Sequence, residues 1–264
     1  MKKAHVILTS LLVCFCLIAF SQNANQTVKK TVTTVKKTTV SFKPLNVITP
    51  QEKKEGFVLL FDGKTITNWH GYGMTGMPAK GWEAKDGLMH CIGSGNGEAG
   101  GGGDIVSNEK FKDFELKLDW KISEGGNSGI FILAQEKKGQ PIYYSSPEMQ
   151  ILDNDRHPDA KLGKDGNRKA GSLYDLIPAK PQNTKPAGQW NTVSIICYQG
   201  TVVYNQNGVN VVEYHLWTDE WKNMVKDSKF KDWADFLNVA HEGLIGLQDH
   251  GNDVWFRNIK IKKM

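Results

Sequence analysis

Alternating apolar and polar residues dominate the chain from residue 56 onward. The clearest case runs from Phe114 to Ile122, where every second residue is apolar and charged residues lie between. Side chains of a strand point alternately to its two faces, so this segment predicts a half-buried antiparallel strand with a solvated charged row. Similar patterns predict strands at 56–61, 82–84, 88–92, 126–133, 148–153, 192–198, 201–205, 209–214, 243–248 and 254–261.

Turn signals separate the strands. Asp-Gly at 86–87 and Asn-Gly at 207–208 are typical of tight hairpins. In the last strand, Phe256 and Ile259 cannot share one face under strict alternation. A bulge near Arg257 and Asn258 is therefore predicted.

Helical signals are few. Capping residues and mixed polarity predict two short surface helices, at 218–225 and 228–237. Two long polar loops, at 93–103 and 156–171, are of the kind that is functional or mobile in compact domains. Together the elements predict an all-β fold, a two-sheet antiparallel sandwich.

The first residues have the pattern of a secretory leader. Lys2 and Lys3 precede an apolar run that ends at Phe20, and small residues favour cleavage after Ser21. The run is too short and too early for a membrane-spanning helix. We expect a signal peptide over 1–21, export to the periplasm or the outside of the cell, and no stable membrane insertion after its removal.

A basic segment follows the predicted leader. A seven-residue Thr/Val/Lys unit at 27–33 nearly repeats at 34–40 and has too little apolar mass for a core. We expect a disordered tether over 22–52 and one folded domain over 53–264. The chain has 33 Lys and Arg against 28 Asp and Glu, but seven lysines precede residue 44. The remainder is slightly acidic, which argues against a nucleic-acid partner.

Two cysteines remain after the predicted leader. Cys91 and Cys197 each lie in an apolar, strand-like run. A disulfide and a buried free thiol both fit such positions in an exported protein. Their separation argues against a structural zinc site.

The strand that begins at Glu148 carries the most suggestive polar residues. Alternation places Glu148 and Gln150 on one face, and Met149 and Ile151 on the other. A carboxylate and an amide backed by apolar residues suit a polar cleft, although a structural salt bridge would also fit Glu148. Asp153 has the opposite parity, so it reaches this cleft only if the strand ends or bulges first; turn stabilisation is the alternative.

Six motifs follow one another along the predicted domain. They are Gly-Asn-Ser-Gly-Ile at 126–130, Glu-Met-Gln-Ile-Leu-Asp at 148–153, Gly-Ser-Leu-Tyr-Asp-Leu-Ile at 171–177, Gly-Gln-Trp-Asn-Thr at 188–192, Gly-Leu-Ile-Gly-Leu-Gln-Asp-His-Gly at 243–251 and Phe-Arg-Asn-Ile at 256–259. In this order they resemble the 3-keto-disaccharide hydrolase family. The resemblance extends from about residue 56 to the end, and the ordered set is specific although each motif alone is weak.

The resemblance implies a concanavalin A-like jelly-roll sandwich, export, and cleavage of glycosides already oxidised at carbon 3. The implied partner is therefore a 3-keto disaccharide or glycoside. A ketone at carbon 3 acidifies the proton on carbon 2, and the resulting enolate can expel the aglycone from carbon 1 before water adds. This route needs a base, an acid near the leaving oxygen, and donors or a metal at the enolate oxygen. A divalent metal is thus left open as a cofactor.

Residues in the matching motifs become the site candidates. The catalytic candidates are Glu148, His250 and Tyr174, and the candidate metal ligands are Glu148, His157 and His250. The candidates for substrate binding are Asn127, Ser128, Gln150, Asp153, His157, Gln248, Asp249 and Arg257. Each also has a purely structural interpretation, such as a turn bond for His250 or aromatic packing for Tyr174.

Two other functions fit the same pattern. A non-catalytic carbohydrate-binding module could use the same fold, because sandwiches of this kind host both. An ordinary retaining glycosidase needs two carboxylates at short spacing. The opposite parities of Glu148 and Asp153 weaken that second alternative.

Overall fold

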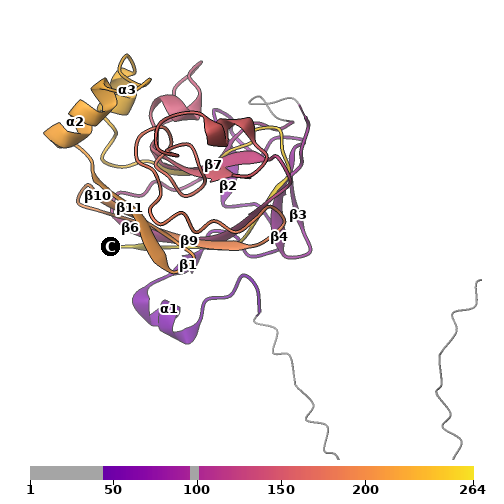
Figure 1. Cartoon of the computed structure of the whole chain (residues 1–264). Coiled ribbons are helices and arrows are strands. Elements are labelled where there is room, and N and C mark those ends of the chain that lie inside the picture. Colours follow the sequence, from indigo (N-terminus) through magenta and orange to yellow (C-terminus); the bar gives the residue numbers. More distant parts are fainter. Residues whose placement is uncertain (1–43, 96–100) are drawn as a thin grey trace, which may run out of the picture. The chain divides into compact units, whose positions relative to one another are not determined.

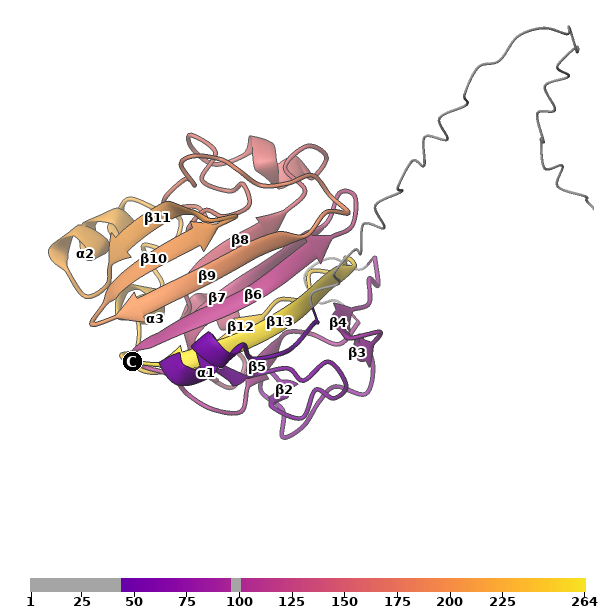
Figure 2. The same cartoon turned by 90° about the horizontal axis from the view of Figure 1, so that it is seen from below.

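Two antiparallel β-sheets form the folded part of the chain, which a computed structural model describes over residues 44–95 and 101–264. The sheets pack face to face (Figures 1 and 2). The predicted jelly-roll sandwich is confirmed. The predicted leader, most of the predicted tether and residues 96–100 of the loop at 93–103 lie outside the described residues.

The larger sheet has eight strands. Seven follow the order β11-β10-β9-β6-β13-β4-β3, and β1 pairs with β13 outside this path. Their bounds are β1 Val58–Leu59, β3 Trp82–Lys85, β4 Leu88–Cys91, β6 Phe114–Ile122, β9 Asn191–Tyr198, β10 Thr201–Gln206, β11 Val209–His215 and β13 Val254–Lys263. Each lies within or close to a predicted strand.

Strand β6 follows the predicted alternation, with one correction. Its apolar residues are buried, but Asp119 is buried as well rather than solvated. The Asp119 carboxylate accepts hydrogen bonds from Thr192 Oγ1 at 2.8 Å, Arg257 Nε at 3.0 Å and Asn258 Nδ2 at 2.8 Å. Three donors compensate the desolvation of the charge, which the alternation pattern alone cannot reveal.

The smaller sheet has five strands in the order β2-β5-β12-β7-β8. Their bounds are β2 Trp69–Gly71, β5 Ile105–Ser107, β7 Asn127–Ala134, β8 Glu148–Leu152 and β12 Leu244–Leu247. Strands β2 and β5 were not predicted, because three residues are too few to show an alternation. In the β7–β8 pair, Phe131 lies opposite Glu148 and Gly129 opposite Gln150.

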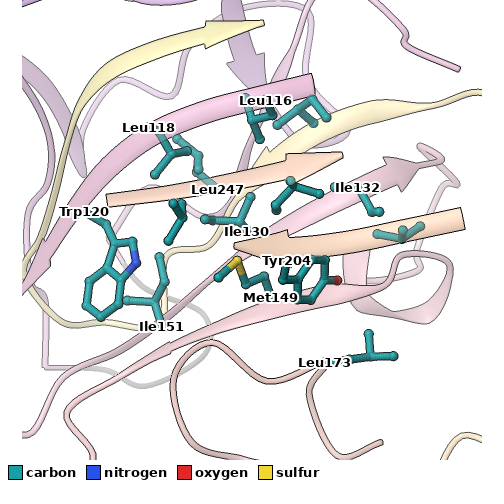
Figure 3. Close-up of a cluster of buried hydrophobic side chains, with 14 of the residues drawn as sticks. Leu116, Leu118, Trp120, Ile130, Ile132, Met149, Ile151, Leu173, Tyr204 and Leu247 are labelled. Carbon is teal, nitrogen blue, oxygen red and sulfur yellow. The ribbon is translucent and has the colours of Figure 1, made fainter. Parts of the chain in front are cut away.

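The core lies between the two sheets (Figure 3). Leu116, Leu118 and Trp120 of β6 point from the larger sheet toward Ile130 of β7 and Met149 of β8. All five side chains are at most 1% exposed. Burial of this apolar surface is the main force that holds the sheets together.

Within residues 44–95 and 101–264, three α-helices and two 3-10 turns lie around the sandwich. Their bounds are α1 Pro50–Glu55, α2 Asp219–Lys226, α3 Ala234–Leu237, η2 Ile142–Tyr144 and η3 Pro158–Lys161. Helix α2 matches the prediction and has Thr218 as its N-cap. The second predicted helix is wrong over residues 228–233 and reduces to α3. Helix α1 was not predicted, and its start overlaps the end of the predicted tether.

The predicted turns are confirmed. Asp86 and Gly87 have φ values of 52° and 77°, and Asn207 and Gly208 have 51° and 85°. Two consecutive positive φ values are the signature of the tight hairpin turn that suits twisted strands. The predicted bulge lies between Arg257 and Lys260, where Asn258 has a φ of 55°.

Both cysteines are buried free thiols. Cys91 lies on β4 and Cys197 on β9, and strands β13 and β6 lie between them in the sheet. Three steps of about 4.8 Å separate the strands by about 14 Å, which is too far for a disulfide. No helix in the described part of the chain is long and apolar enough to cross a membrane.

Candidate active site

A cavity of about 260 Å³ lies on the face of the smaller sheet that is turned away from the core. Strand parity explains this position. Ile130 and Ile132 of β7 point into the core, whereas Phe131 belongs to a separate cluster on the other face. Glu148 lies opposite Phe131 and therefore shares that outer face. Polar residues on the side of the smaller sheet that line the cavity are Asn127, Ser146, Glu148, Gln150, Gln248 and His250.

Glu148 lies on the floor of the cavity and is only 7% exposed. The strand beside it has a glycine where a side chain would collide with the carboxylate. A Cβ atom built onto Gly129 would stand 2.2 Å from Glu148 Oε1. The Gly129 position therefore gives the carboxylate its space over the sheet.

Two buried amide oxygens indicate that the ligand of this cavity supplies hydrogen-bond donors. Asn127 and Gln248 line the cavity and are 6% and 9% exposed. Asn127 Oδ1 and Gln248 Oε1 are buried and have no hydrogen-bond partner among the described residues. A buried acceptor without a donor is costly, and hydroxyl groups of a bound ligand would satisfy both.

Gln150 lies between Glu148 and the end of β8 and is 1% exposed. Its Oε1 accepts a hydrogen bond from the backbone N–H of Ile151 at 3.2 Å. This bond fixes the orientation of the Gln150 amide. The predicted pairing of Glu148 and Gln150 on one cleft face is confirmed by their shared cavity.

Two histidines meet beside the cavity. The rings of His157 and His250 lie edge to face with centroids 6.3 Å apart, and His250 lines the cavity. His157 caps η3 through its Nδ1, which accepts a bond from the backbone N–H of Asp159 at 3.2 Å. Burial, and after it the neighbouring His250, lowers the pKa of His157. His157 therefore packs against His250 but does not itself line the cavity.

Tyr174 lines the cavity next to a half-buried charge network. Its hydroxyl donates to Asp159 Oδ2 at 3.0 Å, and Arg168 Nη1 donates to Asp159 Oδ1 at 2.9 Å. Arg168 also pairs with Asp175. Burial, followed by the charges of Asp159 and Glu148, raises the pKa of Tyr174. The phenol therefore keeps its proton, and that proton is directed to Asp159.

The opposite wall of the cavity was not predicted from the sequence. It comes from the segment around α2 and α3, together with one tyrosine of η2. The residues are Tyr143, Lys229, Phe230, Trp233 and Phe236. Trp233 stacks on Tyr144 with centroids 4.2 Å apart, and Phe230 stacks on Phe236 at 4.3 Å. Aromatic residues at 230, 233 and 236 were visible as a signal, but such spacing is also that of an ordinary amphipathic segment.

Two predicted substrate-binding carboxylates lie outside the cavity lining and hold loops instead. Asp153 is 2% exposed and accepts from the backbone N–H of Gly125 at 2.7 Å and of Asp155 at 3.1 Å. Asp249 is fully buried and accepts from the backbone N–H groups of Gly102 and Gly103 at 2.9 and 3.0 Å. Their acceptor sites are thus used within the chain.

Two further predicted residues do not reach the cavity. Ser128 points into the core, where its Oγ donates to the backbone oxygen of Gln248 at 2.9 Å. Arg257 lies on the larger sheet, where it bonds Asp119 and stacks on Trp190 at 4.0 Å. Both have structural partners that strand parity and sheet pairing decide.

The predicted metal ligands do not form a recognisable metal centre. Among residues 44–95 and 101–264, no group of three or more His, Cys, Asp and Glu side chains is placed to hold a metal ion. His157 also uses its Nδ1 as a helix cap.

The comparison with known protein families decides the relationship of the chain. The model of the 3-keto-alpha-glucoside-1,2-lyase-like domain matches residues 56–262. The chain belongs to this family. The match extends from β1 to the penultimate residue of β13, so it covers strands of both sheets and the whole cavity lining.

Three proteins from two organisms illustrate what the chain is similar to. A 3-keto-disaccharide hydrolase from Bacteroides thetaiotaomicron is 54% identical over 228 residues, which cover 79% of this chain and 78% of that protein. A crystal structure of a candidate glycosyl hydrolase from Parabacteroides distasonis is 30% identical with a TM-score of 0.74, covering 84% and 100% of the two chains. A second candidate from the same organism is 26% identical with a TM-score of 0.62, covering 79% and 99%.

Proposed function

We propose that this protein is a glycoside-cleaving hydrolase that acts on 3-keto-disaccharides. The observation that carries the proposal is the 54% identity to a 3-keto-disaccharide hydrolase over most of both chains. The cavity supports it independently. A buried carboxylate lies beside two buried amide acceptors, which suits a ligand rich in hydroxyl groups.

In the proposed reaction, Glu148 removes the proton from carbon 2 of the oxidised ring. The C–H electron pair becomes the bond between carbons 2 and 3, and the ketone oxygen takes the negative charge. When the ketone re-forms, the pair shifts to carbons 1 and 2 and expels the aglycone oxygen, which receives a proton from His250. Water then adds at carbon 1, so one water is consumed and two sugars are released.

The surroundings of these groups suit their roles. Glu148 is almost enclosed and lies on the cavity floor, where its carboxylate can meet a bound ring. His250 lines the same cavity, and an imidazole can both donate and accept a proton. Tyr174 presents its oxygen as an acceptor, because its proton points to Asp159. Asn127 and Gln248 accept from the ring hydroxyls.

The test compares a 3-keto-disaccharide with its unoxidised parent. We expect sugar release from the ketone alone, because the parent has no acidic proton on carbon 2. Binding of the ketone without turnover would favour a carbohydrate-binding module instead. Equal cleavage of both substrates would favour an ordinary glycosidase and contradict the proposal.

Two variants assign the acid and base. We expect Glu148→Gln and His250→Ala to lose at least about 10²-fold in kcat while keeping the wild-type melting temperature. Arg257→Lys serves as a matched control, since that side chain lies on the other sheet. Wild-type turnover of either site variant would remove that residue from the mechanism.

We also propose that the protein acts after export. The support is the leader pattern of residues 1–21 in the sequence. Cell fractionation with N-terminal sequencing tests it. We expect an extracytoplasmic protein that begins at Gln22, and a cytoplasmic protein that retains Met1 would contradict the proposal.

A further inference from the structure

One ammonium group lies at the cavity and has no role in the reaction as described so far. Lys229, in the segment between α2 and α3, is the one Lys or Arg among the described residues that line the cavity. Its Nζ lies 4.1 Å from the ring centroid of Tyr174 and 5.2 Å from that of Phe230. Both rings line the same cavity, so the ammonium lies at its edge.

Opposing effects act on the pKa of the Lys229 ammonium. Burial lowers the pKa of Lys229, and the positive charge of Arg168 acts in the same direction. The carboxylates of Asp175, Glu148 and Asp159 act in the opposite direction. The net pKa is below that of a free lysine, yet the carboxylates favour the charged form. Lys229 as a whole is still exposed, so it lies at the mouth, where a bound substrate would shield it from water.

The other polar groups of the cavity are weaker candidates to stabilise an oxyanion. The Tyr174 proton is already directed to Asp159. Asn127, Gln150 and Gln248 offer only neutral amide N–H donors. A charged donor is also roughly twice as strong a hydrogen-bond partner for an anion as a neutral one.

We propose that Lys229 is a catalytic residue that donates a hydrogen bond to the ketone oxygen and stabilises the enolate. This inference rests on the proposed function. As Glu148 takes the carbon 2 proton, the carbonyl electron pair moves to the oxygen on carbon 3, and the ammonium balances the new charge. The ammonium keeps its proton and forms no covalent bond, and its contribution ends when the ketone re-forms.

Replacement of the ammonium tests the proposal directly. For Lys229→Met we expect kcat with a 3-keto-disaccharide to fall by about 10²–10³-fold, with a much smaller change in KM. Lys229→Arg should recover part of the loss, because it restores a cationic donor. The matched control is Lys231→Met, an exposed lysine two residues away that does not line the cavity.

Two further measurements separate catalysis from packing. We expect Lys229→Met to slow the exchange of the carbon 2 hydrogen in D2O by the same factor as kcat. The activity of the wild type should fall at high pH as Lys229 loses its proton, and Lys229→Arg should move that fall to higher pH.

Several outcomes would overturn the role of Lys229. Undiminished turnover by Lys229→Met would do so, as would a lower kcat with normal hydrogen exchange. An adduct on Lys229 after treatment with substrate and cyanoborohydride would show an imine instead of a hydrogen bond. These results leave the proposed function intact, whereas absence of ketone-specific turnover in the wild type would refute that function and, with it, the role of Lys229.

Discussion

The space above Gly129 is occupied by the carboxylate of Glu148. Any side chain at this position would push the carboxylate away from the point at which it meets the substrate. The backbone of Gly129 is not in the left-handed region, so a substitution meets the neighbour and not the chain itself. Gly129 therefore contributes to the reaction indirectly, because it allows the Glu148 carboxylate to keep its position.

We predict that Gly129→Ala lowers kcat by about 10²-fold, because a displacement of about 1 Å is enough to disturb a catalytic group. Steady-state kinetics and thermal unfolding measure the two effects separately. Gly76→Ala is the matched control, since no atom lies within 4 Å of a Cβ built there. Normal kinetics of Gly129→Ala would show that the carboxylate position is not critical.

Because the amide oxygen of Asn127 has no partner among the described residues, its removal should affect the stability of the protein and the binding of substrate in opposite ways. Asn127→Leu removes a buried acceptor without a donor, so the free energy of unfolding without ligand should stay the same or rise by about 1 kcal/mol. KM should increase about tenfold, because a hydrogen bond of about 1.4 kcal/mol to a substrate hydroxyl is lost. Denaturant unfolding and kinetics on one preparation measure both. A lower stability with unchanged KM would mean that Asn127 has a structural role.

At the scale of single residues, strand parity predicted part of the site. It brought Glu148 and Gln150 to one face, and the motif resemblance added Asn127, Gln248 and His250. Asp153 and Asp249 were expected to bind substrate, but they accept backbone N–H groups of loops. The bond from Asp155 to Asp153 is the turn stabilisation predicted as the alternative role of Asp153. The donors at Gly125 and Gly102 come from residues far along the chain, so their positions cannot be deduced from local sequence.

Helix α1 is attached to the larger sheet by one ion pair. Lys260 Nζ of β13 lies 2.6 Å from Glu52 Oε1, and the backbone N–H of Thr49 donates to Glu52 Oε2 at 3.0 Å. Burial raises the pKa of Glu52, but the bonds from Lys260 and Thr49 outweigh it and lower the pKa from 4.5 to about 2. The charged carboxylate is therefore favoured in the folded state.

We predict that Glu52→Gln lowers the free energy of unfolding by about 1 kcal/mol at pH 7. The folded pKa is below the unfolded one, so this contribution is complete above pH 4.5 and is lost as the pH falls toward 2. Denaturant unfolding of both proteins at pH 7 and at pH 3 measures it. A difference that grows on acidification would contradict the assignment.

At the scale of elements, long alternations were reliable and short elements were not. The nine residues of β6 and both hairpins followed from the sequence. Strands β2 and β5 have three residues each and exist because neighbouring strands provide their hydrogen bonds. The segment at 228–233 has helical composition, but its aromatic residues pack against η2 and α3 instead.

At the scale of the whole molecule, the separation of the two cysteines in the sheet and their burial predict how the thiols react. Burial, and then the charge of Asp113, raises the pKa of Cys197 to about 12, and burial also raises the pKa of Cys91. We predict that neither thiol reacts with a disulfide reagent while the protein is folded, and that both react after denaturation. A chromogenic thiol assay with and without guanidinium checks this. Rapid labelling of the native protein would indicate local opening of β4 or β9.

The overall fold was predictable because the sandwich depends on many similar signals along the chain. The floor of the cavity could be predicted, because its residues lie on strands. Most of the wall could not be predicted, because it lies on the segment that connects β11 to β12. Parity places side chains on the strands. No such rule fixes where the segment after β11 folds back over the sheet.

Most of the cavity wall comes from the stretch of chain between β11 and β12, whereas Glu148, Gln150 and Asn127 come from β8 and β7. This stretch carries two kinds of residue, the proposed catalytic ammonium of Lys229 and the aromatic rings of residues 230, 233 and 236. Exchange of the whole stretch between family members would therefore change the reaction rate and the shape of the sugar site together. Exchange of the three ring positions alone, with Lys229 kept, should change which leaving sugar is preferred while the reaction stays the same.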